Sequence, residues 1–314
     1  MDFEGGSVFL KYTRMIVALA FLAVICTSAL AEGINSDYSS QKADYWYQRG
    51  LDAAGNGAYQ NALDNYEKAL QICPDKAAFW DGKAAALMSL YLSEKNRTAF
   101  NNSLQAYTRA IELYNASIAS KPQDADVWYF KGLAQSNKGF ALQKGHAFNI
   151  SSDELNESEL LIDAIRSYQN ALKINPKYAT AWKNIGMNFY ALGKYNESLQ
   201  AYDQAIALDS SYPLAWYNKG ITLFKLSRYS EALQAFDKAL QVFPKNEELW
   251  LLKGNCLAAL GNQTQAIDCY DTAIRLRPSY SDAWHQKGVA YQKLGLNTVA
   301  DAAFSQARYF GKIV

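Results

Sequence analysis

The sequence predicts an all-α protein, a right-handed superhelical solenoid of seven helix-turn-helix repeats. The first observation is a period: successive tryptophans are separated by 34, 48, 54, 34, 34 and 34 residues. They are Trp46, Trp80, Trp128, Trp182, Trp216, Trp250 and Trp284. The second is that a small residue, usually glycine, follows each tryptophan by four positions, with small or aromatic residues sixteen, twenty and twenty-three positions after it in the units of plain length. A fixed period of this length is typical of stacked helical repeats.

Composition excludes several classes of function. Lys and Arg total 31 against 30 for Asp and Glu, and a net charge of +1 gives no reason to expect nucleic-acid binding. Two His and four Cys leave little material for a metal centre or a catalytic imidazole. We therefore expect a protein that is not an enzyme and that holds no metal or cofactor.

The N-terminal residues resemble an export signal. Lys11 and Arg14 precede the apolar run that starts at Met15, and Ala29 and Ala31 form the small-x-small pattern of a signal-peptidase site. We expect residues 1–31 to be a signal peptide cut after Ala31. The alternatives are an uncleaved anchor, because the run is near the minimum length of a membrane-spanning helix, or a segment that is neither. Both the signal and the anchor place the rest of the chain outside the cytoplasm, secreted or at the cell surface, and residues 32–42 read as a polar linker.

Asparagine usage supports export independently. Seven asparagines begin an Asn-x-Ser/Thr sequon, which accepts glycans only in an exported chain. They are Asn96, Asn101, Asn115, Asn149, Asn156, Asn196 and Asn262. The alternative is that Asn and Ser stand there because they suit turns and helix starts.

The body of the chain, 43–314, divides into seven units. Their ranges are 43–76, 77–124, 125–178, 179–212, 213–246, 247–280 and 281–314. The second and third units contain insertions, which we expect near Leu92–Ser103 and Gly145–Ser158 as exposed loops between the two helices. Within a unit, small residues let the helices approach closely, and a proline stops the second helix in most units because it lacks an N–H and clashes with the preceding turn. One pair cannot bury its apolar face alone, so neighbours share a continuous core.

These residues resemble the tetratricopeptide repeat family, whose pattern is W-x-x-(L/K)-G…Y…A…F…A…P. Trp216-Tyr-Asn-Lys-Gly220 and Tyr229-Ser-Glu-Ala-Leu-Gln-Ala-Phe-Asp-Lys-Ala239 match it closely, and the resemblance covers 43–314. Departures are Ala84 in place of Gly, Ser117 in place of Ala, and the missing last Pro. The resemblance implies a protein that binds other proteins or peptides.

In that family the first helices of the repeats line a concave groove. The resemblance therefore implies an apolar, tyrosine-bearing groove that holds an extended or helical peptide. Its predicted residues are Tyr129, Leu133, Lys183, Met187, Tyr190, Tyr217, Ile221 and Phe224. The alternative for each of them is packing between repeats. Some family members clamp a chaperone's terminal carboxylate, but Met187 stands where that clamp needs Asn, so we do not expect a chaperone-tail receptor.

Three further expectations concern single features. The basic residue three positions after most tryptophans should pack its stem on a neighbouring helix and send its charge to solvent. Cys256 and Cys269 lie on the two helices of one unit and would be either a disulfide or, as we favour, two free buried thiols. The last unit ends in an apolar stretch with Phe304 and Phe310, so we expect self-association or docking there.

Together these features predict an exported, non-catalytic scaffold for a protein or peptide partner, with membrane contact only through an N-terminal anchor. The alternative is an accessory subunit that recruits partners to an envelope assembly, secretion or glycosylation complex.

Overall fold

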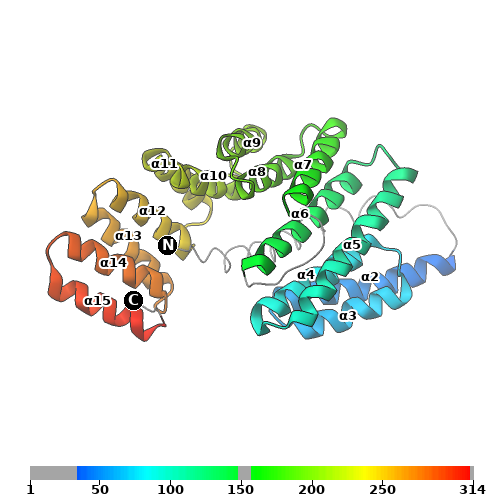
Figure 1. Ribbon diagram of the computed structural model, residues 1–314, viewed down its shortest axis with the longest axis horizontal. Helices are drawn as coiled ribbons and strands as arrows, with labels where there is room; N and C mark the ends of the chain where they lie inside the picture. Colours follow the sequence, from blue (N-terminus) through cyan, green and yellow to red (C-terminus); the bar gives the residue numbers. More distant parts are fainter. Residues whose placement is uncertain (1–33, 148–156, 312–314) are drawn as a thin grey trace. The chain divides into compact units, whose positions relative to one another are not determined.

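The computed structural model describes residues 34–147 and 157–311, with side chains placed in 39–145 and 157–311. These residues form fourteen helices and no strand, arranged as seven consecutive pairs (Figure 1). The first three pairs are α2 (Ile34–Gly55) with α3 (Tyr59–Ile72), α4 (Ala77–Glu94) with α5 (Arg97–Ser120), and α6 (Ala125–Ala147) with α7 (Glu157–Ile174). The last four are α8 (Ala179–Ala191) with α9 (Tyr195–Leu208), α10 (Pro213–Lys225) with α11 (Tyr229–Val242), α12 (Glu247–Ala259) with α13 (Gln263–Leu276), and α14 (Ser281–Lys293) with α15 (Asn297–Tyr309). The predicted all-α repeat fold is confirmed.

The chain forms two compact units, which we call the N-terminal unit (34–175) and the C-terminal unit (176–311). Within each unit the two helices of a pair pack together, and the second helix of a pair packs on the first helix of the next. Contacts therefore join near neighbours in the sequence, as expected of a solenoid.

Close approach within a pair depends on the glycine column. A Cβ on Gly186 would lie 2.5 Å from the ring of Tyr202, and one on Gly220 would lie 2.6 Å from the ring of Phe236. Each aromatic ring thus occupies the space that a side chain on the first helix would need. The alanine twenty-three positions after the tryptophan is fully buried in every plain repeat: Ala69, Ala205, Ala239, Ala273 and Ala307.

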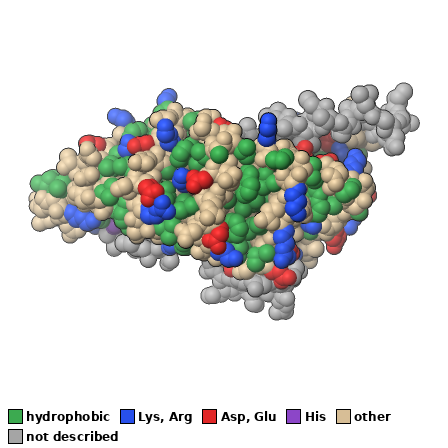
Figure 2. Space-filling view, turned by 90° about the horizontal axis from the view of Figure 1, so that it is seen from above, with side chains coloured by type: hydrophobic (Ala, Val, Ile, Leu, Met, Phe, Trp, Pro, Cys, Tyr) green, Lys and Arg blue, Asp and Glu red, His purple; other side chains and the backbone are tan. Residues whose placement is uncertain are grey.

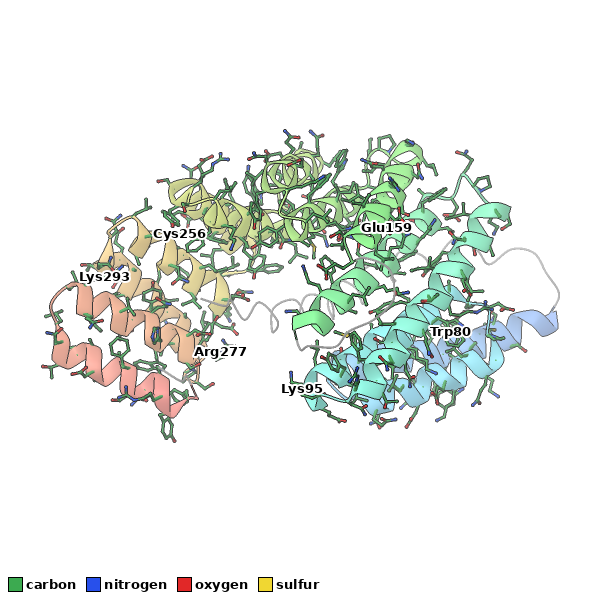
Figure 3. All side chains as sticks on the ribbon, viewed as in Figure 1. Trp80, Lys95, Glu159, Cys256, Arg277 and Lys293 are labelled. Carbon is green, nitrogen blue, oxygen red and sulfur yellow. The ribbon has the colours of Figure 1, made fainter. Side chains whose placement is uncertain are left out.

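Five of the tryptophans are hydrogen-bonded to the turn that precedes their helix pair. The indole N–H donates to the backbone carbonyl six residues earlier, for example from Trp80 (labelled in Figure 3) to Pro74 at 2.7 Å. The same bond, at 2.9 to 3.0 Å, is made by Trp128 to Pro122, Trp216 to Ser210, Trp250 to Pro244 and Trp284 to Pro278. In these repeats the tryptophan therefore holds the turn before the first helix by a hydrogen bond as well as by packing.

The basic column forms bridges between repeats. Lys253 lies over the ring of Trp250, 5.3 Å from its centre, and its Nζ is 2.7 Å from Asp237 on the second helix of the preceding pair. Equivalent ion pairs join Lys83 to Glu67 (3.0 Å), Lys219 to Asp203 (2.6 Å) and Lys287 to Asp271 (2.5 Å). The stems pack as predicted, but the charges meet a carboxylate of the neighbouring repeat.

The predicted linker is largely helical. Helix α2 begins at Ile34, so most of 32–42 continues the first helix of the array instead of preceding it. No proline or glycine interrupts the sequence between Ile34 and Gly50, and the segment therefore extends the helix without a break.

The predicted insertion loop at Leu92–Ser103 is also wrong. The extra residues lengthen helices: α4 has 18 residues and α5 has 24, against 13 or 14 in each helix of the C-terminal unit. Asn96 caps α5, since its side chain accepts the N–H of Ala99 at 3.1 Å. Phe100 is 1% exposed and lies 5.0 Å from the ring of Tyr91, so this segment forms core instead of a loop.

The second insertion contributes to the same core. Helix α6 has 23 residues and α7 has 18, and both carry buried leucines in their extra turns, Leu142 and Leu161. A Cβ on Gly145 would lie 2.4 Å from the ring of Phe100. The extension of α6 therefore packs against that of α5. Residues 148–156 of the predicted Gly145–Ser158 loop lie outside the described residues.

Among the helices of the described ranges, none is both long enough and apolar enough to cross a membrane. The predicted signal segment, 1–31, is not among the described residues.

Candidate partner-binding surface

The structure buries half of the predicted groove residues. Tyr129 is 2% exposed, Leu133 8%, Lys183 1% and Tyr217 5%. Side chains with so little exposed surface cannot contact a partner in this conformation. For these four residues the groove prediction is wrong, and packing between repeats explains them.

These residues are buried because the side chain directly after a tryptophan points toward the next repeat. Tyr217 donates its hydroxyl to Glu248 Oε1 at 3.0 Å, and Glu248 is in the first turn of the next first helix. Tyr47 occupies the equivalent place and stacks on Phe79 of the next repeat, with 4.8 Å between ring centres. This position therefore belongs to the interface between repeats.

The other four predicted groove residues keep accessible surface. Met187 and Tyr190 on α8, and Ile221 and Phe224 on α10, are half-buried. All four belong to the C-terminal unit, where α8 and α10 pack side by side. We call them the apolar stripe.

Lys183 is a buried lysine without a countercharge. Its Nζ has no hydrogen-bond partner among the described residues, and burial lowers its pKa from 10.5 to about 7. In the next repeat the equivalent Tyr217 meets Glu248, whereas the residue that corresponds to Glu248 for Lys183 is Leu214. The sequence of this repeat therefore offers no acid where the pattern would place one.

Asp81 is the acidic counterpart in the N-terminal unit, at the same position of its repeat. It is 6% exposed, its Oδ1 has no partner among the described residues, and burial raises its pKa to about 7. Its charge acts on four tyrosines whose pKa values are raised mainly by burial, with a smaller contribution from Asp81: Tyr47, Tyr66, Tyr107 and Tyr114. The sequence analysis missed both charges as buried groups, although their place in a tyrosine-bearing column was a signal.

The described residues contain no group of three or more His, Cys, Asp or Glu side chains that could hold a metal ion. Cys256 (labelled in Figure 3) and Cys269 are buried free thiols, and burial raises their pKa values to about 12 and about 11. Thiols with such pKa values are poor nucleophiles. On the face seen in Figure 2, basic and acidic side chains are interspersed instead of gathering by sign.

The described sequon asparagines are all exposed: Asn96, Asn101, Asn115, Asn196 and Asn262. However, the serines of two of these sequons form hydrogen bonds within the fold. Ser103 donates to the carbonyl of Phe100 at 2.7 Å, and Ser198 donates to that of Gly186 at 2.8 Å. Asn149 and Asn156 lie outside the described residues.

In the last repeat, Phe304 is not the open surface that the sequence suggested. Its ring packs over Gly288, as the aromatic residue of every plain repeat packs over its glycine, and it lies 5.5 Å from the ring of His285. The exposed large apolar residues of this repeat are instead Leu294 at 44%, Leu296 at 48%, Val299 at 45% and Tyr309 at 81%.

Family models agree with this architecture. Models described as TPR repeat and tetratricopeptide repeat match residues 186–227, 217–281 and 43–76. A protein of Methanocaldococcus jannaschii, uncharacterized protein MJ0572, is 33% identical over 64 residues, which are 20% of this chain and 74% of that protein. The chain belongs to the tetratricopeptide repeat family.

Three further similarities each cover part of this chain. The human protein O-mannosyl-transferase TMTC1 is 27% identical over 175 residues, 49% of this chain but only 19% of the transferase. The crystal structure of MamA has a TM-score of 0.47 at 23% identity and covers 48% of this chain and 89% of MamA. The structure of YrrB, titled a TPR protein with an unusual peptide-binding site, has a TM-score of 0.48 at 20% identity and covers 63% of this chain and 92% of YrrB.

Proposed function

We propose that this tetratricopeptide repeat protein is a non-catalytic scaffold that binds a partner protein or peptide on the first helices of its C-terminal unit. The observation that supports it is the apolar stripe: Met187, Tyr190, Ile221 and Phe224 stay half-buried and accessible, whereas Lys183 and Tyr217 on the same two helices are buried. Accessible apolar and aromatic surface of this kind is typical of recognition sites.

The test is selection of peptides from a random displayed library on the full chain. Selected peptides should bind the variants Met187→Ala and Ile221→Ala at least about tenfold more weakly, a loss of about 1.4 kcal/mol. Met88→Ala is the control, because Met88 is a half-buried residue on α4 of the N-terminal unit. Selected peptides that bind the stripe variants and the control equally well would place the binding surface elsewhere.

We further propose that the scaffold works outside the cytoplasm. The basic flank, apolar run and small-x-small site of residues 1–31 support export, and the five exposed sequon asparagines support glycan attachment. Protease shaving of intact cells, followed by mass spectrometry, should release peptides that begin at Glu32 or carry glycans. Peptides with an intact Met15–Ala31 segment would indicate an anchored chain, and release only after lysis would contradict export.

A second candidate function is an accessory subunit that recruits partners to an envelope assembly, secretion or glycosylation complex. The similarity to part of a protein O-mannosyl-transferase favours it. Co-purification with a catalytic subunit would support this function, and binding only to structural envelope proteins would support a plain scaffold.

The exposed Leu296, Val299 and Tyr309 also support self-association through the last repeat, which sedimentation at tens of micromolar would detect.

A further inference from the structure

Two aromatic pairs stand at equivalent places in adjacent repeats of the C-terminal unit. Tyr190 at the end of α8 lies 5.4 Å from Tyr195 at the start of α9, with 58° between the ring planes. Phe224 at the end of α10 lies 5.2 Å from Tyr229 at the start of α11, with 64° between the planes. All four residues are half-buried, so each pair keeps some accessible aromatic surface.

The repeat does not need these rings for its own packing. Other repeats place small, flexible or polar residues where Tyr190 and Phe224 stand: Ala54, Met88, Ser136, Ala258 and Gln292. Those repeats form the same helix pairs without an aromatic pair at this place. The packing of a helix pair therefore does not account for the four accessible rings in two neighbouring repeats. Recognition of a partner does account for them.

The charged residues near the rings carry a small positive excess. Arg228 holds Glu231 through two bonds of 2.7 and 2.6 Å, so this pair is neutral. Lys194 and Lys225 are exposed and form no ion pair within the described part of the chain, and Glu197 is three residues after Lys194. Asp203, which acts on Arg228, is itself paired with Lys219. These seven charges sum to +1, since four cations face three acids. Charge complementarity favours a partner that carries acidic residues next to its apolar ones.

The spacing expected between two packed helices suits a polyproline II peptide. Packed helices are about 8–10 Å apart, and the pairs sit at the ends of the packed helices α8 and α10. A polyproline II segment advances about 9 Å in three residues, so residues three apart along it would meet successive pairs. Proline-rich segments bind aromatic-lined surfaces because their extended shape is already formed before binding and costs little ordering entropy.

We propose that the two aromatic pairs, Tyr190 with Tyr195 and Phe224 with Tyr229, bind a proline-rich segment of a partner that is flanked by acidic residues. This inference rests on the proposed function and specifies its ligand. Prolines three residues apart pack against the accessible ring surfaces of successive pairs. The acidic flank lies toward Lys194 and Lys225.

The test measures binding of labelled peptides to the full chain by fluorescence anisotropy. The main probe consists of four Pro-Pro-Leu triplets preceded by two glutamates. A second probe has the same length and forms an amphipathic helix of Glu, Lys, Ala and Leu. We expect the proline-rich probe to bind at least about tenfold more tightly than the helical one, because it needs no further ordering.

Variants locate the binding to the rings. The double variant Tyr190→Ala, Phe224→Ala should weaken binding of the proline-rich probe by about tenfold or more. The double variant to Leu keeps apolar volume and should lose binding too, which guards against a folding defect. The controls Met88→Ala and Gln292→Ala change the same position in other repeats and should leave affinity within about twofold.

Each other outcome overturns the inference in a distinct way. If only the helical probe binds, and the double variants abolish it, the ligand class is wrong but the proposed binding function stands. If neither probe binds, the aromatic pairs are not a peptide site. A proline-rich probe whose two glutamates are replaced by lysines should bind more weakly, and equal or tighter binding would refute the acidic flank.

Discussion

The N-terminal and C-terminal units share one frame and differ in helix length. Both carry the tryptophan that bonds back to the preceding turn and a lysine over its ring, as in Trp80 with Lys83 and Trp250 with Lys253. In the C-terminal unit every helix has 13 or 14 residues, whereas α4 to α7 have 18 to 24. Insertions in two adjacent repeats have thus become matched extensions that cover each other.

The units also differ in the charge that they bury directly after a tryptophan. Asp81 in the N-terminal unit and Lys183 in the C-terminal unit stand at the same position of their repeats, and each lacks a countercharge among the described residues. Where this position bears a tyrosine, as in Tyr217, its hydroxyl can reach the next repeat at no cost in charge burial. The comparison shows that the repeat tolerates a charge of either sign there, but only by shifting its pKa.

The largest effect is expected for a substitution in the core that the extensions of α4 to α7 form. Phe100→Ala should lower the free energy of unfolding of the N-terminal unit by about 3–5 kcal/mol, because the ring is buried between Tyr91 and Gly145 and leaves a cavity. Urea denaturation of the full chain, followed by circular dichroism, measures it. Gln105→Ala, an exposed change on the same helix, is the control. A cost of Phe100→Ala below about 1 kcal/mol would mean that the extensions do not contribute a core.

The next effect concerns pH, and the two units should respond in opposite directions. For Asp81 the folded pKa of about 7 lies above the ordinary value of 3.8, so the folded state is most stable when the carboxyl is protonated and loses stability as the pH rises from about 4 to 7. For Lys183 the folded pKa of about 7 lies below the ordinary 10.5, so stability is lost as the pH falls from about 10.5 to 7. Each shift corresponds to roughly 4–5 kcal/mol at most.

Variants without the charge isolate the two effects. Asp81→Asn should stabilise the protein, with a gain that grows from pH 4 to 7 and is constant above. Lys183→Met should also stabilise it, with a gain that is constant below pH 7 and shrinks toward pH 10. Chemical denaturation of both variants across this range provides the measurement. Gains with the same pH slope in the two variants would contradict the assignment of these charges.

The smallest effect concerns the ion pairs between repeats. Lys253→Met keeps the stem over Trp250 and removes the bond to Asp237, so we expect a loss of about 0.5 kcal/mol that shrinks in high salt. Lys131→Met should cost less, because the residue at the place of the acid in the preceding repeat is Asn115. Equal losses in both variants, unchanged by salt, would show that packing of the stem matters and the ion pair does not.

The sequence predicts the helix pairs well because their determinants are local and repeated: a tryptophan, a small residue one turn later, an aromatic residue opposite it. It fails at Leu92–Ser103, where length alone suggested a loop. The apolar Phe100 and the capping Asn96 were the available signals for a helix, but only its contact with Gly145 of another repeat explains why Phe100 is buried.

For the candidate site, family columns predicted which helices carry it but not which side chains are accessible. Tyr217 and Tyr190 look equivalent in sequence, as aromatic residues on first helices. The first is directed to Glu248 of the next repeat, and the second remains half-exposed. This difference depends on residues contributed by the following repeat, so it cannot be deduced from one repeat alone.

The bridges between repeats have an evolutionary consequence. Lys219, Lys253 and Lys287 each pair with an aspartate sixteen residues earlier, and the three lysines and three aspartates occupy identical places in their repeats. A duplication or deletion of 34 residues between such places gives every lysine a new but equivalent partner. Recombination can therefore add or remove whole repeats and leave every lysine with an aspartate partner. The number of repeats is thus a property on which selection can act.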